Sequence, residues 1–211
     1  MAEAALVHVV DDDASLRDSL AMLLEAAGFR VRTYDSAISF LEQASDHGVG
    51  CVLTDVQMPG LNGLELQRRM SALSIRLPVI IMTGFADVPL AVQAMRAGAR
   101  HFLEKPLTEE DLLPAVKDAI AASQQLRDEA TAVADVKARL ATLTPREQEV
   151  LERLVAGHPN KTIAYDLGSS PRTVEVHRAR VMEKMAARSL AELVRMTIAA
   201  ETTGSEKVAS D

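Results

Sequence analysis

Apolar residues along the first 122 positions follow two alternating patterns. Short runs rich in Val, Ile, Leu and Phe are separated by segments in which apolar residues recur every three or four positions, which is the period of an amphipathic helix. Five strand–helix units in series predict an α/β doubly wound, five-stranded parallel sheet of the flavodoxin-like type, with helices on both faces. The expected strands cover residues 5–10, 29–34, 51–55, 78–83 and 100–103.

The rest of the chain predicts helices only. Residues 123–142 are rich in Ala and charged residues and lack Gly and Pro, which favours a helical linker. Residues 143–200 predict four short helices, the middle two joined by the sequence GSS, and this arrangement indicates a small all-α helix-turn-helix domain. Residues 201–211 are expected to form a disordered tail. The expected N-caps of the four helices are Thr144, Asn160, Ser170 and Ser189.

The composition narrows the class of protein. A single Cys among 211 residues excludes an internal disulfide framework, which favours a reducing compartment. No apolar run approaches the roughly 18 residues that a membrane-spanning helix needs, and the N-terminal residues lack a basic signal region. We therefore expect a cytoplasmic protein without a membrane partner.

The net charge of −7 is unevenly distributed. Residues 1–122 hold 10 basic and 17 acidic residues, whereas residues 143–200 hold 9 basic and 7 acidic residues. This asymmetry indicates different partners for the two parts. Because the positive excess of the second part is only +2, we expect modest DNA affinity per domain and a dimer that binds two half-sites.

Polar side chains follow four of the five predicted strands at the point where each strand ends. They are Asp11 and Asp12, Asp55, Thr83 and Lys105. Because ligands of an open parallel sheet bind at the carboxyl ends of its strands, these side chains are expected to meet there. Three carboxylates require a cation, and Mg²⁺ matches their hard oxygen ligands. A hydroxyl and an ammonium opposite the ion suit phosphoryl transfer to a carboxylate.

Each of these residues also has a structural interpretation. A single Asp after a strand is usually a turn residue or a helix cap, and a lone Lys before Pro is usually solvated. The joint occurrence at four strand ends favours the functional interpretation. Asp13 has a different expected role, because it precedes a predicted helix and is expected to cap it.

The stretches VVDDD, TDVQMPGLNG, VIIMTG and FLEKP resemble the signature sequences of a two-component receiver domain over about residues 5–122. This resemblance implies that Asp55 is the phosphoacceptor and that a partner histidine kinase supplies the phosphoryl group. It implies Mg²⁺ ligation by Asp12, Asp55 and the main-chain carbonyl of Gln57, with Asp11 acting through a bound water. Thr83 and Lys105 would bind phosphoryl oxygens. Further implied features are a cis Lys105–Pro106 bond, Phe102 as a switch aromatic, and Gln57 and Phe85 as residues that tune phosphoryl lifetime.

The segment from Leu143 to Met185 resembles the LuxR/NarL-type DNA-binding domain, and the combination is closest to the FixJ subgroup. A helical wheel of residues 172–185 buries Val174, Val181 and Met185 and leaves a face of small apolar residues and Arg on the other side, which suits a major-groove helix. His177 and Arg178 lie nearer the buried side. The candidate DNA contacts are Lys161, Thr162, Arg172, Thr173, Glu175, Val176, Ala179 and Arg180, with His177 and Arg178 as secondary candidates.

We therefore expect a response regulator that dimerises through residues 88–103 once Asp55 is phosphorylated, and then controls transcription with RNA polymerase as an expected partner. The expected catalysis is limited to phosphorylation and dephosphorylation of Asp55 by the receiver itself. One alternative is an aspartyl-phosphate enzyme, which requires a second Asp where Gln57 stands. The other is a receiver whose helical part binds protein instead of DNA.

Overall fold

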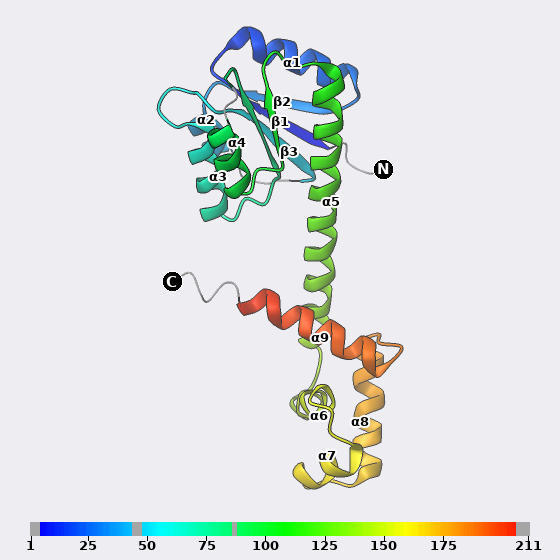
Figure 1. Ribbon diagram of the computed structural model, residues 1–211. Helices are drawn as coiled ribbons and strands as arrows, with labels where there is room; N and C mark the ends of the chain where they lie inside the picture. Colours follow the sequence, from blue (N-terminus) through cyan, green and yellow to red (C-terminus); the bar gives the residue numbers. More distant parts are fainter. Residues whose placement is uncertain (1–4, 44–47, 86–87, 206–211) are drawn as a thin grey trace. The chain divides into compact units, whose positions relative to one another are not determined.

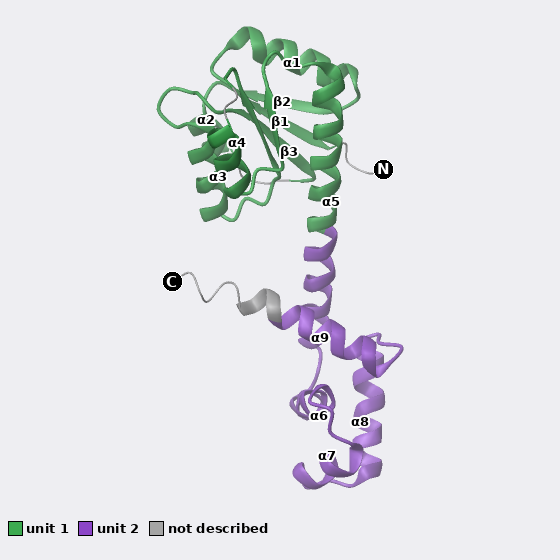
Figure 2. Ribbon diagram, in the orientation of Figure 1, with its two compact units in different colours: residues 1–127 green, residues 128–211 purple. Residues whose placement is uncertain are grey.

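The computed structural model describes residues 5–43, 48–85 and 88–205, with only the backbone for 202–205. The chain divides into two compact units, Met1–Arg127 and Asp128–Asp211 (Figure 2). The boundary falls within one helix, α5, which runs from Glu109 to Leu140.

The first unit is built on a five-stranded, fully parallel sheet with the order β2-β1-β3-β4-β5. In Figure 1, α1 and α5 cover one face of this sheet, and α2, α3 and α4 cover the other. This architecture confirms the predicted fold class. The strands are β1 (Leu6–Val10), β2 (Arg30–Tyr34), β3 (Gly50–Asp55), β4 (Val79–Thr83) and β5 (His101–Glu104). The helices before α5 are α1 (Ala14–Ala26), α2 (Ala37–Gln43), α3 (Gly63–Ala72) and α4 (Val88–Arg96).

Each face of the sheet has its own hydrophobic core. On one face Leu20 and Leu24 of α1 pack with Leu112 and Val116 of α5. On the other face Phe40, Leu66 and Ala94 come from α2, α3 and α4. Strands β3 and β4 are buried along their whole length, as expected for central strands of a parallel sheet.

The sheet order determines where a site can form. The chain leaves β1 toward β2 on one side and returns to β3 on the other, so the carboxyl ends of β1 and β3 border the crevice at which this topology reverses. Asp13 caps α1 by accepting hydrogen bonds from the backbone N–H groups of Ser15 and Leu16, which confirms its predicted capping role.

The second unit contains the end of α5 and four further helices, α6 (Pro145–Val155), α7 (Asn160–Asp166), α8 (Pro171–Lys184) and α9 (Leu190–Ser205). The capping box of Thr144 and Glu147 is present at α6, and Ser170 caps α8. The predicted cap of α7 is wrong. Pro159 is its N-cap, and Asn160 is already its first helical residue. Helix α9 continues to Ser205, beyond the expected end of the last helix at residue 200.

No helix among the described residues is long and apolar enough to cross a membrane.

Candidate phosphoacceptor site and DNA-binding face

Three carboxylates gather at the carboxyl ends of β1 and β3. One ligand oxygen from each of Asp11, Asp12 and Asp55 lies within 4.8 Å of the other two. Asp11 and Asp55 are buried, whereas Asp12 is exposed. This acidic pocket can bind a metal ion, because two of its carboxylates have little access to water that would otherwise solvate their charge.

Lys105 reaches this acidic pocket from the end of β5. Its Nζ donates to Asp11 Oδ2 at 2.8 Å and lies 3.2 Å from Asp55 Oδ2. The Lys105–Pro106 peptide bond is cis, as the resemblance implied. Burial acts against the charge of Lys105, but Asp11 and then Asp55 outweigh it, so the pKa of Lys105 is raised. The ammonium therefore stays charged beside the two carboxylates.

The carboxyl group of Asp55 is only partly satisfied. Its Oδ1 is buried and has no hydrogen-bond partner, while its other oxygen faces Lys105. Burial is the largest cause that raises the pKa of Asp55; Lys105 and the backbone N–H of Gln57 oppose this rise, and Asp11 adds to it. A buried oxygen without a partner is the feature that a bound cation or a covalent group would satisfy.

Thr83 and Phe102 occupy the neighbouring strands. Thr83 ends β4 with its side chain buried, and its Oγ1 exchanges hydrogen bonds with the backbone of Phe85, accepting from N at 3.2 Å and donating to O at 3.1 Å. The Phe85 side chain itself is 74% exposed. Phe102 on β5 is half-buried against the core that contains α4. Thr83 thus lies on β4, the strand next to Asp55 on β3, and its main-chain oxygen accepts a hydrogen bond from the Lys105 backbone N–H at 2.7 Å. Phe102 lies one strand further from the acids, on β5.

Two residues that hold the pocket were missed by the sequence prediction. Arg17 on α1 donates to the main-chain oxygen of Asp11 at 2.7 Å, which fixes the end of β1. Gly63 lies against Asp55, because a Cβ placed there would be 2.3 Å from the Asp55 carbonyl oxygen. The position of Arg17 one helical turn after Asp13 was an available signal for the first contact, but nothing local indicates the second.

The second unit presents the face predicted for α8. Val174 is buried against residues of α6 and α7, whereas Val181 and Met185 lie in the core with Leu151 and Leu193. The exposed residues of α8 include Arg172, Thr173, Glu175, Val176, Ala179 and Arg180, and Val176 is 47% exposed. Lys161 and Thr162 are exposed in the first turn of α7. The Thr173 hydroxyl already bonds to Ser170 Oγ at 2.8 Å.

Two family descriptions cover most of the chain. The response regulator receiver domain matches residues 7–117, and the luxR family of bacterial regulatory proteins matches residues 141–197. The transcriptional regulatory protein FixJ of Azorhizobium caulinodans is 50% identical over 200 residues, 95% of each chain. FixJ of Rhizobium meliloti is 49% identical, over 92% of this chain and 95% of that protein. The chain belongs to the FixJ-like response regulators.

Solved structures agree with this assignment. The response regulator StyR has a TM-score of 0.81 at 40% identity, covering 92% of this chain and 98% of StyR. Full-length FixJ from B. japonicum has a TM-score of 0.57 at 47% identity, covering 94% and 98% of the two chains. This response regulator is therefore a transcription regulator with a receiver and a LuxR-type DNA-binding domain.

In this response regulator the two secondary DNA-contact candidates, His177 and Arg178, are turned toward the interior and toward α7, respectively. Arg178 donates to Asn160 Oδ1 at 3.4 Å, a weak bond that links α8 to the first turn of α7. The His177 ring is half-buried, and its Nδ1 is buried without a hydrogen-bond partner. The Asn160 side chain therefore bonds to α8 and does not cap α7.

Proposed function

We propose that phosphorylation of Asp55 by a partner histidine kinase switches this response regulator between a weak and a strong DNA-binding state. The observation that carries the proposal is the pocket of three carboxylates in which Lys105 pairs with Asp11 and Asp55 while Asp55 Oδ1 has no partner. The position of Asp55 at the end of a central strand, beside the topological crevice, supports its role as the phosphoacceptor.

The residues divide the chemistry between them. An Asp55 oxygen forms a bond to phosphorus as the P–N bond of a kinase phosphohistidine breaks, and the electron pair leaves with the imidazole. Lys105 would stabilise negative charge on the transferred group, and the Thr83 hydroxyl would leave Phe85 to donate to a phosphoryl oxygen. Mg²⁺, held by Asp11, Asp12, Asp55 and the Gln57 carbonyl, would neutralise phosphoryl oxygens when bound. In this proposal the receiver catalyses only its own phosphorylation and dephosphorylation.

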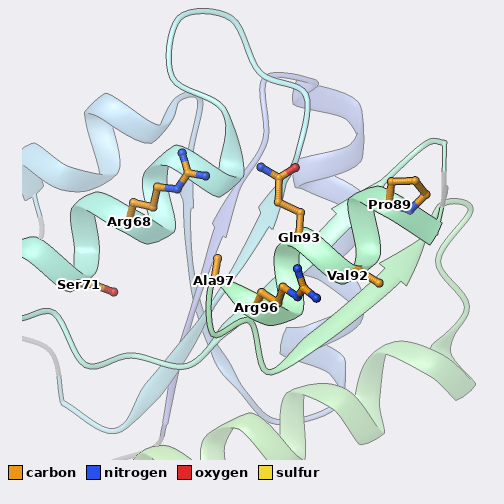
Figure 3. A pocket seen from close by; sticks show the side chains of 7 residues that line it. All are labelled: Arg68, Ser71, Pro89, Val92, Gln93, Arg96 and Ala97. Atoms are coloured by element: carbon orange, nitrogen blue, oxygen red, sulfur yellow. The ribbon is translucent and has the colours of Figure 1, made fainter.

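Helix α4 supplies the surface that would change when Asp55 is phosphorylated. Val88, Val92 and Met95 recur at helical spacing on α4 and are 77%, 45% and 50% exposed. Figure 3 shows Val92 at the edge of a groove between α3 and α4, together with Arg96 from α4 and Arg68 from α3. A shift of Thr83 and an inward turn of Phe102 would reshape this apolar face, and we propose that two copies then associate through it.

Dimerisation would strengthen DNA binding, because it pairs two DNA-binding units that each have a modest affinity for DNA. The exposed face of α8 places small apolar groups between Arg172 and Arg180, which fits thymine methyl groups and guanine or phosphate oxygens in a major groove. Lys161 and Thr162 fit backbone phosphates. Promoter DNA is therefore the proposed ligand, and RNA polymerase is the proposed partner of the DNA-bound dimer.

The proposal is tested by the mass of the full chain in solution before and after treatment with acetyl phosphate and Mg²⁺. The expected result is a monomer that becomes a dimer, with Asp55→Asn remaining a monomer under both conditions. A wild-type mass that ignores the phosphodonor, although intact-protein mass spectrometry shows a stable phosphoryl group, would contradict the switch.

A further inference from the structure

The last turns of α5 are part of the core of the DNA-binding unit. Val136 and Leu140, four residues apart on α5, pack against the cluster that contains Val181 and Met185 of α8. Leu143, Leu151 and Leu193 complete this cluster from the segment after α5, from α6 and from α9. Helix α8, which carries the proposed DNA contacts, is therefore packed at its carboxyl end onto α5. Helix α5 ends at Leu140, before the first residue that the luxR family matches, residue 141.

A guanidinium group joins the two helices at this end. Arg139 of α5 donates from Nη1 to the main-chain oxygen of Met185 at 3.0 Å. Met185 is the C-cap of α8, and the helix ends there because Ala186 has a φ of 52°. The last carbonyls of a helix lack intrahelical partners and carry its negative dipole end, so a cation is favoured at this position.

A second contact runs in the opposite direction. Lys184, in the last turn of α8, donates to the main-chain oxygen of Thr142, two residues after the end of α5, at 3.0 Å. The same ammonium donates to Glu147 Oε2 at 2.6 Å, and Glu147 is 2% exposed in the capping box of α6. The ends of α5 and α8 are thus joined by two charged hydrogen bonds, each directed at a main-chain carbonyl.

These contacts lie at the opposite end of α8 from Arg172, the first proposed DNA-contact residue on that helix. Arg172 precedes Met185 by 13 residues, which is about 20 Å along an α-helix. A tilt of about 5° at the Met185 end would therefore move the Arg172 end by nearly 2 Å, enough to break a hydrogen bond to a base edge. Contacts to phosphates from long, flexible side chains would tolerate such a movement.

We infer that Arg139 and Lys184 are positioning residues for DNA recognition, which fix the angle at which α8 enters the major groove. This inference rests on the DNA-contact face given in the proposed function. It assigns a role in sequence discrimination to a part of α5 that touches no DNA itself. It also makes residues from about 136 onward a necessary part of the DNA-binding unit.

The test compares specific with non-specific DNA binding by the full chain. A duplex is selected from a random library with the wild-type protein, in acetyl phosphate and Mg²⁺, and the Kd is then measured for this duplex and for a scrambled one. Arg139→Met is expected to weaken binding to the selected duplex about tenfold, the effect of one misplaced base contact. The affinity of Arg139→Met for the scrambled duplex, and the salt dependence of its DNA binding, should stay as in the wild type. Arg139→Lys should recover most of the affinity for the selected duplex that Arg139→Met loses.

Each other outcome counts against the inference. Equal losses on both duplexes would show a purely structural role, and a salt slope reduced by about one would show that Arg139 itself contacts a phosphate. An unchanged ratio of the two Kd values would remove the positioning role. Arg180→Ala, which removes a proposed contact, provides the comparison. If the wild-type chain selects no sequence at all, the proposed function fails, and this inference fails with it.

Discussion

A divalent cation bound in the acidic pocket would compete with Lys105 for the carboxylates of Asp11 and Asp55. The Lys105 Nζ lies 2.8 Å from Asp11 Oδ2 and 3.2 Å from Asp55 Oδ2, and both residues belong to the acidic pocket. Lys105→Met keeps the length of the side chain and removes its charge. We therefore predict that this variant binds Mg²⁺ more tightly than the wild type, although it is phosphorylated more slowly.

The expected size of the effect follows from electrostatics. A unit positive charge about 5 Å from a divalent cation raises the free energy of binding by roughly 2 kcal/mol when water screens most of the field. This value is a lower limit, because the Lys105 side chain is only 20% exposed and water screens its charge less than in bulk; we therefore expect at least a tenfold gain in Mg²⁺ affinity. Without metal, the variant leaves the buried Asp11 carboxylate with the Asp13 N–H but without a cation, which lowers the free energy of unfolding by about 3 kcal/mol.

Titration calorimetry measures the Mg²⁺ affinity directly, which suits a chain without Trp. Denaturant unfolding in EDTA and in excess Mg²⁺ measures the stability, and Mg²⁺ should restore what the variant loses. The rate of phosphorylation by acetyl phosphate should fall at least about 100-fold. Lys117→Met, at an exposed site on α5, is the matched control and should change none of these. A Mg²⁺ affinity that is unchanged or weaker in Lys105→Met would refute the competition.

Three further predictions concern the rest of the chain. The Lys184 ammonium and then the Thr144 backbone N–H lower the pKa of Glu147 to about 2, so the stability that Glu147 contributes is present above the ordinary pKa of 4.5 and is lost as the pH falls to about 2. Glu147→Gln should therefore lower the Tm at pH 7 and reduce the fall of the Tm between pH 4.5 and pH 2. A Tm that falls as steeply in acid as in the wild type would count against the pairing of Glu147 with Lys184. Gly63→Ala should cost about 2 kcal/mol in denaturant unfolding and slow phosphorylation, because the new Cβ would displace the Asp55 carbonyl; normal values for both would show that the backbone adjusts freely. Val92→Glu on α4 should leave Asp55 phosphorylation intact and prevent the proposed dimer, as measured by mass in solution. A phosphorylated variant that still dimerises would place the interface elsewhere.

The sheet and most of its helices could be predicted from the hydrophobic pattern, because residues close together in the sequence determine whether a segment forms a strand or a helix. The buried strands β3 and β4 follow from continuous apolar runs, and the capping roles of Asp13 and Thr144 follow from residue type and spacing. The meeting of the three acids follows from the topology of a parallel sheet. These features need no knowledge of distant contacts.

The features that could not be predicted depend on residues far apart in the chain. Asn160 looks like an N-cap, but Pro159 adopts the extended conformation of a cap, and the Asn160 side chain bonds to Arg178. The bond from Arg139 to Met185 spans 46 residues, and the residue that accepts it contributes only its main chain. Every residue has a main-chain oxygen, so the identity of the acceptor residue does not indicate this hydrogen bond. The contact between α5 and α8 could therefore be found only from the structure.

The most direct test of the proposed switch is the Kd of the full chain for its selected duplex, measured with and without acetyl phosphate, for the wild type and for Asp55→Asn. We predict that phosphorylation tightens the wild-type Kd at least tenfold, as expected when a second binding unit is recruited, and leaves Asp55→Asn unchanged. Equal Kd values for the wild type in the two conditions, or an equal gain in Asp55→Asn, would contradict control of DNA binding through Asp55.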